Sequence, residues 1–248
     1  MALIAHPVPG KQKAVDICKA FIKGAPANAD GDVFFGVNHG NLAPYLRAKA
    51  LGRDWYYIDN SYIDQYRHVY YRVAKNALQC KGTEPSTGER FRALGVEIKP
   101  WRERTGNDIL VCSQNDNFMA TAVGYKGNWT KDTVRKLQAM NLPYRIRIRP
   151  WNPDKVKTGK ILLEDLGNLH LLVTHSSASA ITAMLEGVPA ISEAGAARVH
   201  TGPLTLESVL RPPKPETREQ LAWALADNMW TLDEIRAGKA WAWLNRSK

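Results

Sequence analysis

The sequence predicts an α/β protein built from two halves, each with parallel β-strands joined by helices. Short apolar runs bounded by turn residues alternate with segments of helical periodicity, which is the pattern of strand–helix–strand units. A chain of 248 residues with 44% hydrophobic and 23% charged residues has enough apolar material for one large core or two small ones. These observations exclude a wholly disordered chain.

The first half contains one clear strand–helix–strand unit. Helical spacing predicts a helix over Ala14–Lys23. An apolar run at Asp32–Val37 predicts a buried strand, Leu42–Leu51 a helix, and Trp55–Ile58 the next strand. Strand, helix and strand at this spacing form a parallel βαβ unit.

The rest of the first half is less regular. We expect a strand at Tyr70–Val73, a short helix at Glu89–Leu94 and an extended segment at Gly95–Pro100. The spacing of these segments places a domain boundary between residues 105 and 106, so that the domains are residues 1–105 and 106–248.

The second half opens with an apolar strand at Asp108–Cys112. Thr130 is a suitable N-cap for a helix that reaches Met140. Strict alternation over Tyr144–Arg149 predicts another strand, and Leu162–Leu166 a short helix.

A second parallel unit follows. Leu171–Val173 predicts a strand, residues 174–177 form a polar turn, and a helix runs to Glu186 with Gly187 as its stop. Val188–Ile191 predicts the next strand. Ligands of parallel sheets bind at the carboxyl ends of strands, so this turn is a candidate binding site.

The C-terminal tail is predicted to be helical. Thr217 with Gln220, and Thr231 with Glu234, match the capping-box pattern. Tryptophans are frequent in this segment, which makes it aromatic.

Composition and motifs exclude several classes of protein. No run of 18 apolar residues exists, so we expect no transmembrane helix, and the apolar N-terminal run is too short for a signal peptide. Three widely spaced cysteines argue against disulfides and favour a reducing, cytoplasmic location. We expect no metal site, because HExxH, CxxC and paired histidines are absent, and GxGxxG, Walker and GxSxG motifs are absent too.

The positive charge points to a phosphate-bearing ligand. The formal net charge is +10, and residues 126–160 hold ten basic residues against Asp132 and Asp154. Such a stretch attracts the phosphates of a nucleotide or of nucleic acid. A solvated basic face is the alternative interpretation.

The strongest chemical signal is the segment from His175 to Pro189. Small hydroxyl residues at a helix start leave backbone N–H groups open toward an anion, and His175 adds a further donor. A pyrophosphate fits this environment. The alternative is a well-capped helix whose small residues pack tightly on the sheet.

The same segment resembles a known fold family. A strand, a Ser-rich turn, a helix and the pattern Ala183–Ile191 resemble the donor domain of glycosyltransferases with two Rossmann-like domains (the GT-B fold). The tail Trp230–Trp241, and Trp55–Asn60 in the first half, resemble small phage-type relatives of capsule-polysaccharide transferases. The Ser-rich turn also occurs in sugar epimerases of the same architecture.

The resemblance implies two Rossmann-like domains facing across a cleft, with a C-terminal helix packing back on the first domain. It implies a nucleotide sugar, expected to be a UDP-sugar, as co-substrate, with no further cofactor and no metal. The implied donor-binding residues are His175, Ser176, Ser177, Ser179, Arg147, Arg149 and Glu193. The alternative for the arginines is a solvated edge strand, and for Glu193 a loop carboxylate.

The first half then has to supply the catalytic base and the acceptor site. Asp59 follows the strand Trp55–Ile58 and is our choice of base, with His39 as its rival. A turn or cap residue is the alternative for Asp59, and a surface histidine for His39. The expected acceptor-binding residues are Asn38, Asn60, Tyr62, Arg72 and Trp101, with a core role as the alternative for the aromatic rings.

The basic balance and the phage-type features favour 5-hydroxymethylpyrimidine in phage DNA, such as hydroxymethylcytosine, as the acceptor. DNA would then be a partner, and the protein would act in the host cytoplasm. Two alternatives stay open: a transferase for surface polysaccharide or glycolipid, and a non-catalytic nucleic-acid-binding protein with a degenerate Rossmann pair.

Overall fold

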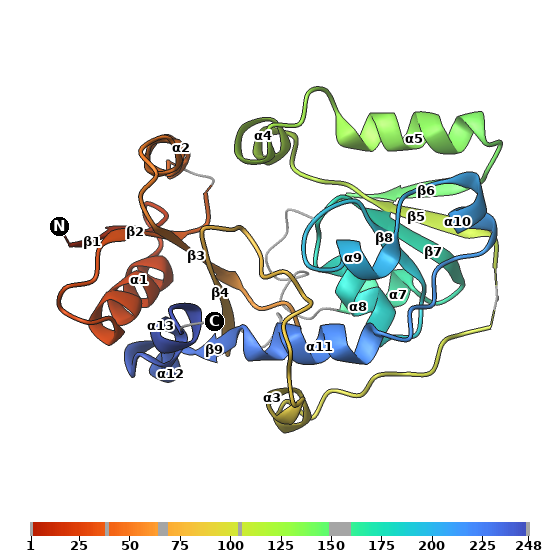
Figure 1. Cartoon of the computed structure of the whole chain (residues 1–248). Helices are drawn as coiled ribbons and strands as arrows, with labels where there is room; N and C mark the ends of the chain where they lie inside the picture. The colour runs from red at the N-terminus through yellow and green to blue at the C-terminus, as the bar shows by residue number, and fades with distance from the viewer. Residues whose placement is uncertain (1, 38–39, 64–68, 104–105, 149–159, 247–248) are drawn as a thin grey trace. The chain divides into compact units, whose positions relative to one another are not determined.

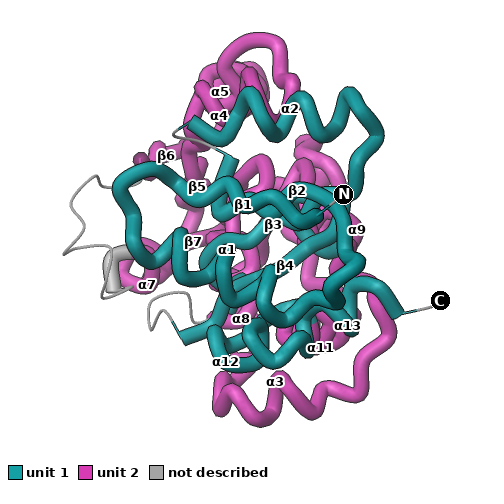
Figure 2. The backbone as a smooth tube through the Cα atoms, turned by 90° about the vertical axis from the view of Figure 1, so that its left-hand side faces the viewer, with its two compact units in different colours: residues 1–80, 228–248 teal, residues 81–227 magenta. Residues whose placement is uncertain are grey.

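The computed structural model describes residues 2–37, 40–63, 69–103, 106–148 and 160–246 (Figure 1). The chain forms two compact units (Figure 2). Unit 1 comprises residues 1–80 and 228–248, and unit 2 comprises residues 81–227. Residues 81–105, which we expected in the first half, lie in unit 2, where Lys99 N donates to Leu185 O at 2.8 Å and Arg102 N to Gly187 O at 2.8 Å.

Unit 1 is built on a mixed five-stranded sheet in the order β1-β2-β3-β4-β9. The three parallel strands are β1 (Leu3–His6), β2 (Gly31–Phe35) and β3 (Trp55–Asn60). Strand β4 (Tyr70–Lys75) runs antiparallel to β3, and β9 (Met229–Thr231) runs antiparallel to β4. The apolar strand β3 is therefore central, and the predicted βαβ unit is confirmed.

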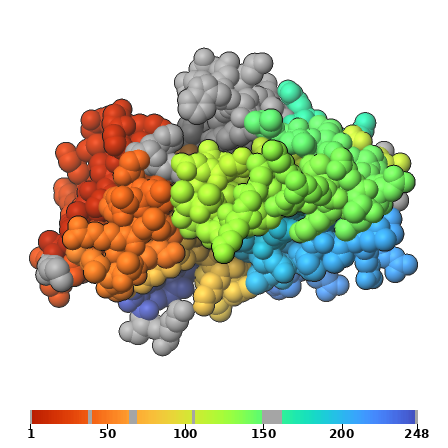
Figure 3. Space-filling view, turned by 90° about the horizontal axis from the view of Figure 1, so that it is seen from above, coloured from red at the N-terminus to blue at the C-terminus, as the bar shows by residue number. Residues whose placement is uncertain are grey.

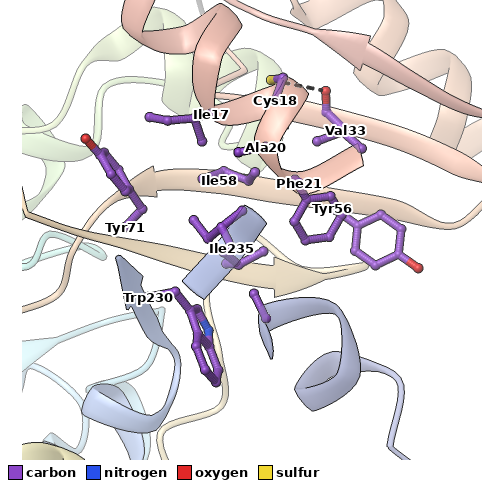
Figure 4. Packing of buried hydrophobic residues seen from close by; sticks show 12 residues of the cluster. Ile17, Cys18, Ala20, Phe21, Val33, Tyr56, Ile58, Tyr71, Trp230 and Ile235 are labelled. Carbon is purple, nitrogen blue, oxygen red and sulfur yellow. Dashed lines mark hydrogen bonds between the residues drawn. The ribbon is translucent and has the colours of Figure 1, made fainter. Parts of the chain in front are cut away.

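Helices cover both faces of this sheet. On one face, α1 (Gln12–Gly24), α12 (Leu232–Arg236) and α13 (Lys239–Leu244) pack over a core that includes Val33 and Ile58 (Figure 4). Burial raises the pKa of Cys18 in this core to about 12, so its thiol stays protonated. On the other face, α2 (Leu42–Ala50) places Tyr45 edge-on against Phe34 and Trp55.

Unit 2 is built on an all-parallel four-stranded sheet in the order β6-β5-β7-β8. Its strands are β5 (Asp108–Cys112), β6 (Tyr144–Arg147), β7 (Leu169–Thr174) and β8 (Ala190–Ser192). All six residues of β7 are buried, which agrees with a central strand covered on both faces.

Two sets of alternating side chains fill the two faces of the unit 2 sheet. Val111 and Val173 pack against Trp129 and Leu137 of α5 (Trp129–Ala139). The side chains that alternate with these valines along β5 and β7 are buried on the opposite face of the sheet. On that face, α8 (Ser179–Leu185) contacts β7 and β8 (Figure 1). The remaining helices are α3 (Glu89–Ala93), α4 (Asp116–Phe118), the π-helix η1 (Met119–Val123), α7 (Lys160–Asp165), α9 (Arg198–Thr201), α10 (Leu206–Leu210) and α11 (Arg218–Asp227).

Gly187 ends α8 as predicted. Its φ is +78°, and a Cβ there would collide with the carbonyl oxygen of Pro100, so both backbone conformation and space require glycine. One predicted cap is wrong: the side chain of Asn128, and not Thr130, accepts from Lys131 N at the start of α5. Two strands, β1 and β9, were missed.

Within the part of the chain that the structure describes, no helix is long and apolar enough to cross a membrane.

Candidate functional site

The turn after β7 is tied to the end of β8. Glu193 N donates to Thr174 O at 3.1 Å, and Ala194 N donates to His175 O at 2.6 Å. The Ser192 hydroxyl also donates to His175 O, at 3.1 Å. These bonds hold the segment 174–178 at the carboxyl ends of two parallel strands, which is where the sequence placed a ligand site.

The predicted hydroxyl residues occupy different surroundings within this turn. Ser176 Oγ lies 3.2 Å from His175 Nδ1, and Ser177 Oγ accepts from Ser179 N at 3.2 Å. Ser179 is buried, and its hydroxyl lies beside the thiol of Cys112. The structure therefore brings His175, Ser176 and Ser177 together at the turn, with Ser179 beneath them in the first turn of α8.

Two aromatic rings that the sequence argument missed lie against His175. Tyr125 and Trp129 meet it edge-on, with ring centroids 6.3 and 6.0 Å away. Burial lowers the pKa of His175, and the negative charge of Glu193 opposes that shift. The imidazole is therefore neutral near pH 7 and can act as both hydrogen-bond donor and acceptor.

Glu193 has fixed partners on α5. Its Oε2 accepts from Trp129 Nε1 at 2.7 Å, and its Oε1 lies 3.4 Å from Lys136 Nζ. A loop carboxylate held in this way has a defined position beside His175. The sequence predicted the helix that contains Trp129 and Lys136. Only the tertiary structure shows that this helix lies at the end of β8.

Arginines from the edge strand β6 lie close to the same turn. Arg147 and Arg145 both pair with Asp165 of α7, at 2.8 and 2.9 Å. Burial raises the pKa of Cys112, whereas the Ser179 hydroxyl and the positive charge of Arg147 lower it, which places Arg147 near the start of α8. The guanidinium of Arg147 at the end of β6 and the donors of the turn after β7 therefore lie in the same part of unit 2, and this arrangement suits an anionic ligand.

In unit 1, Asp59 lies inside β3, whereas we had expected it just beyond the end of this strand. The antiparallel pairing with β4 continues to Asn60 and sets Asp59 opposite Arg72. Asp59 Oδ2 accepts from Tyr57 OH at 2.9 Å and from Arg72 NH2 at 2.7 Å, and Oδ1 accepts from Asn60 N at 2.8 Å. Its side chain is still 31% exposed, so one edge of the carboxylate remains accessible.

Lys13 of α1 adds a second cation near this carboxylate. Its Nζ lies 3.4 Å from Asn60 Oδ1 and 4.9 Å from the centre of the Tyr71 ring. Burial lowers the pKa of Lys13, and Asp59 opposes this shift. A carboxylate flanked by two cations is a plausible proton acceptor only for a substrate hydroxyl that reaches its exposed edge.

Two solved transferase structures share the fold of this chain. Thermosulfurimonas dismutans KpsC, beta Kdo 2,4 transferase, is similar with a TM-score of 0.55 and 12% identity, over 93% of this chain and 92% of that chain. Thermosulfurimonas dismutans KpsC, beta Kdo 2,7 transferase, gives a TM-score of 0.50 and 10% identity, over 97% of this chain and 99% of that chain. No family model and no curated protein matches the sequence. At these identities the likeness establishes the α/β fold alone.

Tyr62 and Arg72 differ from the exposed residues that we expected. Tyr62 is fully buried, and its hydroxyl accepts from Cys80 N at 2.7 Å, so its ring is closed to stacking with a ligand. Arg72 is 13% exposed, its guanidinium carbon lies 5.0 Å from the centre of the Tyr62 ring, and it pairs with Asp59. The core role that the sequence left as the alternative for the aromatic rings therefore holds for Tyr62, and the position of Arg72 depends on its pairing with Asp59 across β3 and β4.

Trp101 lies in unit 2 and is half-buried, with the guanidinium of Arg218 stacked on its ring at 3.9 Å. A hollow of about 300 Å³ beside it is lined by Glu216 and Glu219 among other residues. The predicted site residues Asn38, His39 and Arg149 lie outside the described residues. Among the residues that the structure describes, no group of three or more His, Cys, Asp and Glu side chains is arranged to hold a metal ion.

The described part of the basic stretch 126–160 divides into two groups. Lys126, Lys131 and Arg135 are exposed around α5, on the surface that Figure 3 shows in green. Arg135 pairs with Asp132 on its own helix at 2.9 Å. Arg145 and Arg147 are instead engaged with Asp165. The first group is exposed to solvent, and the second is part of the candidate site.

Proposed function

We propose that the chain is a glycosyltransferase that uses a nucleotide sugar. The observation that carries the proposal is the convergence of His175, Ser176, Arg147 and Glu193 at the carboxyl ends of the unit 2 strands. This set offers hydroxyl, imidazole and guanidinium donors for a diphosphate, and a carboxylate for sugar or ribose hydroxyls. The shared fold with two transferases supports the same function.

Each unit has a distinct task in this proposal. Unit 2 binds the donor through the turn 174–179 and the β6 arginines. Unit 1 binds the acceptor, and Asp59 takes the proton of the attacking hydroxyl as the new glycosidic bond forms and the nucleoside phosphate leaves. His39 is the alternative base.

The acceptor that we favour is a hydroxyl of a saccharide. The two similar structures are named as transferases of Kdo, a sugar, and this supports a polysaccharide or glycolipid acceptor over other classes. The test is mass spectrometry of products after incubation with a panel of nucleotide sugars, UDP-sugars included, and saccharide acceptors. A mass increase by one glycosyl unit is expected, and hydrolysis or no change with every donor would refute the transferase proposal.

Hydroxymethylated phage DNA is a second candidate acceptor, supported by the net charge of +10 and the exposed Lys126, Lys131 and Arg135. Binding to duplex DNA should then weaken with salt, with a log–log slope of about 0.9 per neutralised phosphate. Absence of DNA binding at low salt, together with turnover on a saccharide, would remove this candidate. Salt-sensitive DNA binding without any sugar transfer would favour the non-catalytic alternative.

The arginines of β6 give a direct test of the donor site. Arg147→Ala should raise the donor KM or lower kcat, because Arg147 lies near the start of α8. Arg145→Ala should do so less, because Arg145 lies farther from the carboxyl end of its strand and also pairs with Asp108, at 3.5 Å. Arg149→Ala belongs in the same series. Negligible effects from all three variants would remove the arginines from the donor site.

A further inference from the structure

Arg145 and Arg147 converge on one carboxylate. They alternate along β6, so both side chains lie on the same side of the strand. Asp165 Oδ1 lies 2.9 Å from Arg145 NH1, and Asp165 Oδ2 lies 2.8 Å from Arg147 Nε. Arg145 NH2 also donates to the backbone oxygen of Asp165, at 2.6 Å. A single carboxylate thus bridges two guanidinium groups, each through a different oxygen.

Two oxygens of a phosphate group would bridge the same two arginines equally well. Guanidinium groups bind carboxylate and phosphate with the same N–H···O geometry. Arg147 contacts Asp165 through Nε, and its two terminal nitrogens carry four more N–H donors. Its side chain is only 17% exposed, so water screens this pair less than it would screen a surface pair.

The bridge also lies next to the turn that the donor is proposed to occupy. Arg147 lies opposite Cys112 in the pairing of β6 with β5, and Cys112 lies opposite Thr174, where the turn begins. The charges of Arg147, Asp165 and Arg145 also act on the Cys112 thiol, which lies beside the Ser179 hydroxyl. Asp165 therefore places a negative charge where the arginines would otherwise meet the ligand.

We propose that Asp165 is an internal substitute for a donor phosphate: it occupies Arg145 and Arg147 in the free chain, and the donor diphosphate displaces it. This inference rests on the proposed donor site. Asp165 then affects the affinity for the donor through the arginines, since donor binding has to break the ion pairs of Asp165 with Arg145 and Arg147. Removal of the carboxylate charge should then tighten binding, whereas loss of an ordinary structural ion pair would weaken it.

The test compares Asp165→Asn with Glu164→Gln. Glu164 is the exposed neighbour of Asp165 on α7, so Glu164→Gln changes the net charge equally without touching the arginines. Calorimetric titration with inorganic pyrophosphate and with UDP should give about fivefold tighter binding for Asp165→Asn, the scale of one partly buried ion pair. Glu164→Gln should bind as the wild type does. In Arg147→Ala/Asp165→Asn the gain should disappear.

The outcomes separate this inference from the proposed function. Equal or weaker pyrophosphate binding by Asp165→Asn overturns the substitute role, and the transferase proposal stands if the wild type still binds UDP and transfers sugar. In the opposite case, Asp165→Asn binds pyrophosphate more tightly, but no variant binds UDP or transfers sugar. This result supports Asp165 as a phosphate substitute and refutes the transferase proposal. If Asp165→Asn does not fold, Asp165→Ser replaces it, because it also removes the carboxylate and its charge from between the two arginines. Tighter pyrophosphate binding is expected for this variant too, and no change overturns the inference.

Discussion

The polar clusters at the strand ends of the two units have opposite designs. In unit 1 one carboxylate, Asp59, is surrounded by donors from Tyr57, Arg72 and the backbone of Asn60. In unit 2 donors predominate at the turn, and the carboxylates of Glu193 and Asp165 are held at its edge by Trp129 and by arginines. The first arrangement presents a hydrogen-bond acceptor to a ligand, and the second presents hydrogen-bond donors. This difference agrees with a base in unit 1 and an anionic donor in unit 2.

The largest effect is expected from substitution of Asp59 in unit 1. Asp59→Asn keeps the shape of the side chain and removes the proton acceptor, so transfer should fall by about 100-fold or more while donor binding persists. Tyr57→Phe is the control, because it removes one donor to Asp59 and leaves the carboxylate in place. Steady-state kinetics decides the matter. Near-normal kcat in Asp59→Asn with an inactive His39→Ala would assign the base to His39.

The second effect tests whether the Asp59–Arg72 pair also stabilises unit 1. Burial lowers the pKa of Arg72, but Asp59 and the neighbouring tyrosines raise it more, so its pKa is above the ordinary value. Arg72→Met should therefore lower the free energy of unfolding by about 2 kcal/mol, because it leaves Asp59 without its cation. Lys75→Met on the same strand breaks the more exposed pair with Asp54 and should cost about 0.5 kcal/mol. Urea unfolding that gives equal losses would contradict this difference.

The third effect tests the unit 2 turn. Ser176→Ala should weaken UDP binding by about 1 kcal/mol, the scale of one hydrogen bond. Ser177→Ala should weaken binding by a similar amount and also lower stability, because its hydroxyl accepts from Ser179 N. Calorimetry and thermal melting separate the two contributions. Unchanged UDP affinity in both variants would exclude the turn as the phosphate site.

The smallest effect concerns pH. Burial lowers the pKa of His175, so between that lowered value and about 6.5 the unfolded chain binds more protons than the folded chain. The free energy of unfolding should therefore fall as pH falls through about 6.5. His175→Asn removes this contribution, and its stability should decline less between pH 7.5 and 5.5 in parallel urea titrations. A steeper decline in His175→Asn would mean that the folded state favours the protonated imidazole.

The sequence predicted those parts of the fold that depend on local pattern. The apolar runs of β3, β5 and β7, and the helix that ends at Gly187, were all recognised from neighbouring residues. The equally short strands β6 and β8 were recognised from strict alternation and from a place directly after a helix stop. Neither signal is present in β1 and β9, which were missed. Their pairing with distant strands forms them.

For the candidate site, local pattern indicates only the turn 174–179 and Glu193, which lie next to predicted strand ends. Trp129, Tyr125 and Asp165 come from distant segments, and only the tertiary structure brings them to the turn. Asp59 was found, but its pairing with Arg72 depends on the antiparallel register of β3 and β4, which no local pattern encodes.

The division of unit 1 into residues 1–80 and 228–248 has a consequence for the order in which the chain folds during synthesis. While the ribosome translates the segment that becomes unit 2, β4 has no β9 to pair with, and the core lacks Trp230 and Ile235. All of unit 2 is translated before the last strand of unit 1. The N-terminal sheet, although made first, is therefore completed last, and until then it exposes both an unpaired strand edge and apolar surface that a chaperone recognises.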